Sequence, residues 1–248
     1  MGYFTVDLKP DFVASKLQAT IGAHKVLFDW VPIQVPKGTV CLKSVTALIR
    51  PKGDTGPTEN AKGFDLLFSK TNTISLGVTG GDPTHFPIND YLGAVEILAG
   101  NAATNYINGT IVLSTASQSG DTEPANMPLI MTPTESASAG FDTIYVAAVT
   151  VNAPSFTTIN TIQTTEAASA TIHCNGSGMD LREHFLPGDV LHTATTVGAA
   201  DADTLIGTVL TVDSATNITL TDTAAVTHVD GTLIMNINPI RIRLGFEQ

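Results

Sequence analysis

Three histidines and one cysteine in the C-terminal half are the residues whose types could bind a metal ion. They are His173, Cys174, His184 and His192. Imidazole nitrogens and thiolate sulfurs are the usual ligands of zinc, but structural zinc sites arrange their ligands in closely spaced pairs. None of those paired spacings occurs here. We therefore interpret these side chains as residues on strand and turn surfaces, and we expect no metal.

Acidic residues that are close together in the sequence suggest two other kinds of site, one for calcium binding and one for acid–base catalysis. Asp201 and Asp203 resemble the start of a calcium-binding loop, but the glycine and glutamate that complete an EF-hand loop do not follow them. His85 lies between Asp82 and Asp90 in a proline-containing loop, which suggests an acid–base pair, yet no nucleophile accompanies it. We interpret the first pair as solvated turn acids and the loop around His85 as a contact region.

The sequence lacks the local patterns of nucleophilic and nucleotide chemistry. It contains no Gly-x-Ser-x-Gly motif, no Walker loop and no dinucleotide-binding fingerprint. The glycine-rich segment 77–81 lacks both the lysine and the following helix that a phosphate site requires. We therefore expect a protein that is not an enzyme and that needs no cofactor.

Charged residues in loops and on the last strand are better suited to protein contacts than to catalysis. The segment 51–63 has no apolar period and is interrupted by proline and glycine, which predicts a long exposed loop. Arg241 and Arg243 share one face of the final strand, where they either pair with a neighbour's carboxylates or form a solvated face. Further contacts are expected from the loop 80–89 and the N-terminal arm. The candidate interface residues are Lys52, Asp54, Glu59, Lys62, His85, Arg241 and Arg243.

Strands are the elements expected to position these residues, because the chain is rich in β-branched side chains that pack well on a pleated surface. Turns are indicated at 36–38, 186–189 and 213–217, and the last of these predicts a hairpin. Residues 90–98 are ambiguous between helix and strand, 10–21 suit either one helical turn or irregular structure, and 179–184 suit one helical turn. Strands are predicted over 3–8, 24–35, 39–50, 64–69, 74–78, 105–115, 142–152, 170–174, 189–194, 205–212, 217–221, 232–237 and 236–246.

The order of these segments predicts an all-β protein with two domains. Thr, Ser and Asn dominate residues 154–168, where we place the junction. Residues 1–155 are expected to form a β-sandwich of jelly-roll-like type, and residues 165–235 a small β-barrel. The alternating final strand, 238–248, is expected to return to the sandwich, so that the barrel is an insertion before it.

The overall composition excludes some classes of function. The 248 residues are 43% hydrophobic and 14% charged, which predicts a folded chain. The formal net charge of −11 disfavours nucleic-acid binding, and no apolar run is long enough to span a membrane. The N-terminus lacks a signal-peptide pattern. Cys41 and Cys174 fall in different predicted domains, so we expect no disulfide between them.

Part of the predicted barrel resembles a known module. Leu-Pro-Gly-Asp-Val-Leu at 186–191, the segment 205–221 and Ala-Ala-Val at 224–226 together resemble a small β-barrel that is common in tailed-bacteriophage virion proteins. The strands of the first domain are similar in style to those of capsid decoration proteins, including cyanophage ones. The resemblance implies a protein made in the host cytoplasm that binds the major capsid protein on the outer capsid surface. It further implies a homo-oligomer, often a trimer at threefold axes, that strengthens contacts between capsomers without binding nucleic acid or membrane.

Two other classes of function remain open. The first is a tail, neck or fibre component, including one that binds host glycans through exposed aromatic residues, although the single tryptophan, Trp30, is expected in the core. The second is a hydrolytic virion enzyme, which needs paired carboxylates in a cleft. The only local cluster suited to that role is Asp82, Asp90 and Glu96.

Overall fold

The structure is a computed structural model. It describes residues 2–51, 60, 62–84, 86–99, 102–106, 110–116, 127–136, 140–158, 160–163, 169–175, 180–194, 204–224 and 227–248. Strands hold 51% of the residues and helices 6%, and the strands pair in antiparallel fashion, so the predicted all-β class is confirmed. The finer expectation of a jelly-roll-like sandwich stays a prediction.

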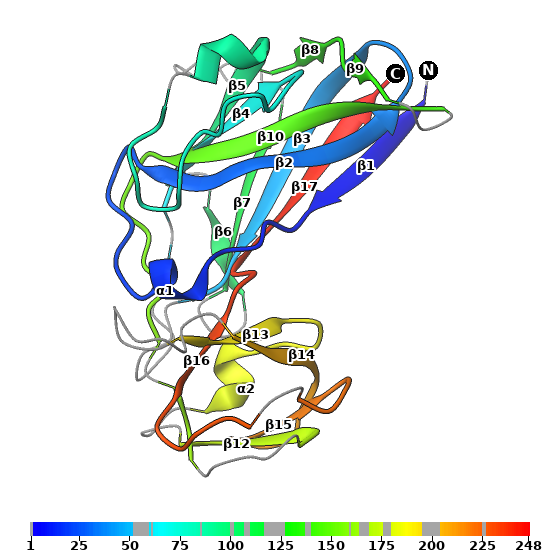
Figure 1. The fold of residues 1–248 in the computed structure, drawn as a ribbon. Helices are drawn as coiled ribbons and strands as arrows, with labels where there is room; N and C mark the ends of the chain where they lie inside the picture. Colours follow the sequence, from blue (N-terminus) through cyan, green and yellow to red (C-terminus); the bar gives the residue numbers. More distant parts are fainter. Residues whose placement is uncertain are drawn as a thin grey trace.

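Two antiparallel sheets, as far as the described residues show, form the upper part of the molecule in Figure 1, which we call the two-sheet module. The larger sheet contains β1 (Tyr3–Leu8), β17 (Ile240–Glu247), β3 (Val40–Ile49), β7 (Thr110–Ala116) and β6 (Ala102–Tyr106) in that order, with β8 (Leu129–Met131) also beside β3. The smaller sheet contains β2 (Val26–Pro36), β10 (Phe141–Thr150), β4 (Phe64–Ser69) and β5 (Tyr91–Ile97), with β9 (Thr134–Glu135) also beside β10.

A closed barrel lies at one end of the two-sheet module (Figure 1). Its strands, in order around the barrel, are β11 (Thr161–Ile162), β12 (Thr171–Asn175), β15 (Asn217–Leu220), β14 (Leu205–Val212), β13 (Val190–Ala194) and β16 (Leu233–Asn236). The barrel therefore already includes residues before 165. The predicted hairpin at 213–217 is confirmed, because β14 and β15 pair across it.

The final strand belongs to the two-sheet module, where β17 lies between β1 and β3. Ile240, Ile242, Leu244 and Phe246 are buried, and the residues between them face outward. On the neighbouring strand β3 the alternation of buried residues shifts by one position, since Val40 and Leu42 are buried and then Val45 and Ala47. A bulge opposite Gly245 absorbs the extra residue.

The core of the two-sheet module is apolar and draws on both sheets. Phe64 and Phe68 from the smaller sheet and Leu42 and Phe246 from the larger sheet are buried in one cluster. A separate and smaller cluster fills the barrel, with Ile172, Leu191 and Ile218 among its members. Each part of the chain thus has a hydrophobic core of its own, as two independently packed units should.

Two expectations about the first half of the chain are wrong. Residues 74–78 are not a strand; they lie over the smaller sheet, where Leu76 covers Trp30. The Asp29 carboxylate accepts the Leu76 backbone N–H at 2.7 Å, and the Trp30 indole donates to the Ile74 carbonyl at 3.0 Å. These two hydrogen bonds hold the segment in place of the backbone pairing that a strand would make with a neighbouring strand. Residues 105–115 are also not one strand, because β6 ends at Tyr106 and pairs with β7.

The strands on either side of the 36–38 turn do not pair with each other. β2 belongs to the smaller sheet and β3 to the larger sheet, so the turn crosses between sheets. Gly38 has φ +103, a conformation that glycine adopts without strain. Residues 90–98, which were ambiguous, contain β5. Trp30 is buried as expected, although in the small cluster outside the main core.

Helices are short in the described parts of the chain. They are α1 (Ala14–Leu17), α2 (Leu181–His184) and the 3-10 turn η1 (Phe86–Asn89). No helix among the described residues has the length and apolar character needed to cross a membrane. Cys41 lies on β3 and Cys174 on β12, and neither forms a disulfide bond.

Candidate functional site

The outer face of the larger sheet carries the two arginines nominated from the sequence. Because Ile240 and Ile242 point into the core, Arg241 and Arg243 must project from the opposite face. Arg243 lies opposite Asp7 of β1 and Thr46 of β3, and Arg241 lies opposite Leu48. The two arginines are therefore neighbours on one exposed sheet face.

These side chains line a cavity of about 490 Å³, which we call the arginine groove. Its volume lies in the range of small-ligand and peptide-binding sites. Leu48 and Val112 give the groove partly exposed apolar surface. The lining residues are Asp7, Leu8, Lys9, Thr46, Leu48, Val112, Arg241, Ile242 and Arg243. Three cations and one carboxylate line the groove, and one of these cations, Arg241, is paired with Asp189 outside the lining.

Arg243 is held in place by Asp7 on the neighbouring strand. Its Nε and Nη2 donate to the two carboxylate oxygens of Asp7 at 2.7 and 2.9 Å. The hydrogen bonds from Arg243 hold the pKa of Asp7 below its ordinary value. Both side chains are more than 60% exposed, so solvent screens the pair and it adds little to stability. Its effect is to fix the direction of the guanidinium.

Arg241 pairs instead with a carboxylate of the barrel. Its Nη2 donates to Asp189 Oδ1 at 2.8 Å, and the Asp189 side chain is only 1% exposed. The second oxygen of Asp189 accepts the Leu186 backbone N–H at 2.9 Å. Burial raises the pKa of Asp189, and nearby Arg50 and Arg241 act against that rise. Asp189 thus closes its own turn and also links the barrel to β17.

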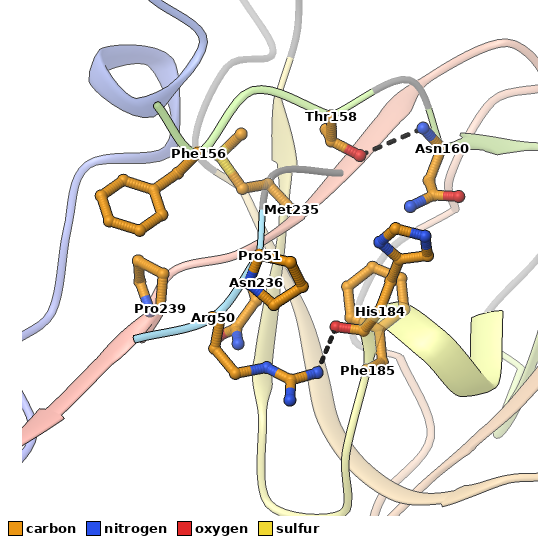
Figure 2. A pocket seen from close by; sticks show the side chains of 10 residues that line it. All are labelled: Arg50, Pro51, Phe156, Thr158, Asn160, His184, Phe185, Met235, Asn236 and Pro239. Atoms are coloured by element: carbon orange, nitrogen blue, oxygen red, sulfur yellow. Dashed lines mark hydrogen bonds between the residues drawn. The ribbon is translucent and has the colours of Figure 1, made fainter. Parts of the chain in front are cut away.

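Further hydrogen bonds link the modules beside apolar contacts, since Met235 of β16 belongs to the core cluster of the two-sheet module, and we call this region the joint. Lys9 Nζ donates to the Gly188 carbonyl at 2.8 Å. Arg50, which follows β3 and is 4% exposed, donates to the His184 carbonyl at 2.6 Å (Figure 2). Within the two-sheet module it also donates to Thr110 Oγ1 at 2.9 Å. Burial lowers the pKa of Arg50. Cations of the two-sheet module therefore add hydrogen bonds to the apolar contacts between the barrel and the larger sheet.

The other candidate interface residues do not join this site in the described chain. Lys62 is exposed just before β4, and its backbone N–H donates to the Asn60 carbonyl at 2.8 Å. Lys52, Asp54, Glu59 and His85 lie outside the described residues. Residues 3–8, part of the expected N-terminal arm, pair along β17.

The candidate metal ligands are spread over the barrel. His173 is exposed and Cys174 is buried, because they point to opposite sides of β12, and His184 lies in α2. Within the residues that the structure describes, no three His, Cys, Asp or Glu side chains are grouped to hold a metal ion. Asp201 and Asp203 lie outside those residues.

The carboxylates nominated for hydrolysis are not brought together. Asp82 forms an ion pair with Lys25 at 2.6 Å. Glu96 on β5 instead lies opposite Asp65 on β4. Burial, and then the charge of Glu96, raise the pKa of Asp65. Two carboxyl groups side by side on a sheet are a source of repulsion, which the sequence did not indicate because it depends on strand register.

Sequence reasoning missed the residues of the joint. Asp189 was assigned only to a turn, and Arg50 and Lys9 were not singled out. Arg50 follows an alternating apolar strand and precedes a proline, which indicates where β3 ends but not that the guanidinium is buried. Comparison with models of known protein families finds no match to this chain, and no curated protein matches it.

Proposed function

We propose that the protein is a non-enzymatic structural component of a tailed-phage virion that binds the outer capsid surface as a decoration protein. One observation carries the proposal. The residues that resemble a phage virion module, 186–191 and 205–221, form β13, β14 and β15 of a closed barrel, and the Pro-Gly-Asp turn within them anchors that barrel to the two-sheet module through Asp189.

The arginine groove is the surface that we assign to the capsid. Arg243 is exposed and pre-oriented by Asp7, so it can meet a carboxylate of the major capsid protein without losing much side-chain freedom. Leu48 and Val112 supply apolar area beside it. A single groove of this size gives a weak contact. A homo-oligomer, for which we favour a trimer, would present several copies and gain affinity through multivalency.

Binding to purified capsids that lack this chain tests the proposal. We expect the protein to co-sediment with capsids, and Arg243→Glu to weaken binding at least about tenfold, since the reversed charge would face a partner carboxylate. Arg182→Glu is the matched control. Arg182 is also exposed, also pairs with a neighbouring aspartate, Asp180, and lies in the barrel away from the groove. It should bind like the unaltered protein, and binding should fall with rising salt.

The outcomes separate the competing locations. Binding of the unaltered protein to isolated tails and not to capsids would favour the tail, neck or fibre alternative. Equal losses for Arg182→Glu and Arg243→Glu would keep capsid binding but reject the arginine groove as its site. No binding to either particle would reject the proposal as a whole.

A further inference from the structure

A small, partly open cavity lies at the joint, where the two modules meet (Figure 2). Its volume is about 30 Å³. The side chains around it come from the end of β3, the connector 151–160, α2 and β16. Ten side chains line it, namely Arg50, Pro51, Phe156, Thr158, Asn160, His184, Phe185, Met235, Asn236 and Pro239. The cavity is thus built by both modules and by the segment that connects them.

Several polar atoms at this cavity lack hydrogen-bond partners among the described residues. Asn160 is 1% exposed, and neither Nδ2 nor Oδ1 of its side chain has a partner. Arg50 Nε and Asn236 Nδ2 are also buried without a hydrogen-bond partner. In Figure 2 the amide of Asn160 extends from the connector toward His184, while Arg50 approaches from the opposite module. Buried polar groups without partners are costly, so native proteins pair nearly all of them.

We propose that the cavity is a binding site for ordered water that bridges the connector, the barrel and the end of β3. A water needs about 10–15 Å³ of such space and usually makes two to four hydrogen bonds, so a cavity of about 30 Å³ has room for about two. Asn160 presents a donor and an acceptor, whereas Arg50 Nε and Asn236 Nδ2 only donate. A water molecule can donate a hydrogen bond to the acceptor and accept hydrogen bonds from the donors. A halide ion would serve the donors but leave Asn160 Oδ1 unpaired.

This site is independent of the proposed virion function. It makes the joint a hydrated contact in which the Asn160 side chain reaches the other module through water.

A crystal structure of the full chain, grown in the presence of bromide at a resolution that resolves individual waters, tests the proposal directly. We expect water density within hydrogen-bond distance of the Asn160 amide and of Arg50 Nε, with no anomalous signal in the cavity. A cavity without density would overturn the proposal. An anomalous bromide peak would overturn it as well, in favour of an anion site.

A pair of matched variants tests the same point in solution. Asn60 is also buried, at 3% exposed, but its amide is fully paired with the Ser155 backbone. Asn60→Leu should therefore lower the melting temperature by about 4 °C or more. Asn160→Leu exchanges a hydrated amide for an apolar side chain of similar shape, and should move the melting temperature by less than about 2 °C. A rise of about 4 °C for Asn160→Leu would mean that the amide is dry and unpaired, and would contradict the water site.

Discussion

The two hydrophobic cores and the joint between them differ in how much of their contact is polar. The core of the two-sheet module and the core of the barrel consist of buried aliphatic and aromatic side chains. The joint combines the polar contacts of Lys9, Arg50, Asp189 and Arg241 with apolar ones, since Met235 of the barrel strand β16 belongs to the two-sheet core. The joint thus adds specific polar contacts to apolar burial. Mutations in the three regions should differ in size and in kind.

The largest loss of stability is expected in the two-sheet core. Phe68 is fully buried, so Phe68→Ala should lower the free energy of unfolding by about 3–5 kcal/mol, because the lost transfer energy and the remaining cavity add together. Denaturant unfolding measures the change. Tyr3→Ala, at a residue that is 75% exposed, is the control and should have little effect. A loss of less than 1 kcal/mol for Phe68→Ala would argue against the described core.

The barrel core should give the next largest effect. Ile218 on β15 is fully buried, and Ile218→Ala should cost about 2–4 kcal/mol. Because the barrel has its own core, backbone amide exchange should increase mainly in the barrel and leave β10 and β17 protected. Uniform loss of protection over both modules would contradict the idea of two separate cores.

The joint provides an internal comparison of two arginine–aspartate pairs on one strand. Asp189→Ala removes a buried carboxylate from Arg241 and from the Leu186 N–H, and should cost about 1–3 kcal/mol. Asp189→Asn should lose less, since an amide oxygen can still accept the Leu186 bond. Asp7→Ala breaks the exposed pair with Arg243 and should leave the unfolding midpoint unchanged. Equal losses for Asp7→Ala and Asp189→Ala would show that burial does not distinguish the two pairs.

The smallest effect concerns pH and a like-charge pair on the smaller sheet. Asp65 has a raised pKa, so its ionised form costs stability above that pKa, and the cost disappears as the pH falls through it. Asp65→Asn should therefore raise stability at pH 7 by a few tenths to about 1 kcal/mol, because solvent screens the half-buried pair with Glu96. Below the ordinary value of 3.8 the gain should vanish. Melting curves of both proteins over this pH range measure it. A gain that persists at low pH would point to a cause other than charge.

Local patterns in the sequence were enough to predict much of the fold. The alternation of Ile240, Ile242 and Leu244 predicts β17, and the turn at 213–217 predicts the β14–β15 hairpin, because both signals depend on near neighbours. The segment 74–78 was misjudged for the same reason. Its apolar residues suit a strand, but the distant Asp29 carboxylate and Trp30 indole provide its hydrogen bonds.

The candidate site was predicted only in part, since it depends on contacts between residues far apart in the chain. Because side chains alternate between the two faces of a strand, the sequence predicted that Arg241 and Arg243 share one face, as the structure shows. It could not indicate that Arg241 pairs with Asp189 of the barrel while Arg243 pairs with Asp7 of β1. Those partners are 52 and 236 residues away, so only the assembled fold brings them together.

Cryo-electron microscopy of virions that carry this chain is the most direct measurement of where the protein acts. Our proposal predicts density for the two-sheet module and barrel on the outer capsid surface, repeated by the icosahedral symmetry, with the face that carries Arg243 turned toward the major capsid protein. Density for this chain on the tail alone, with a bare capsid surface, would contradict it.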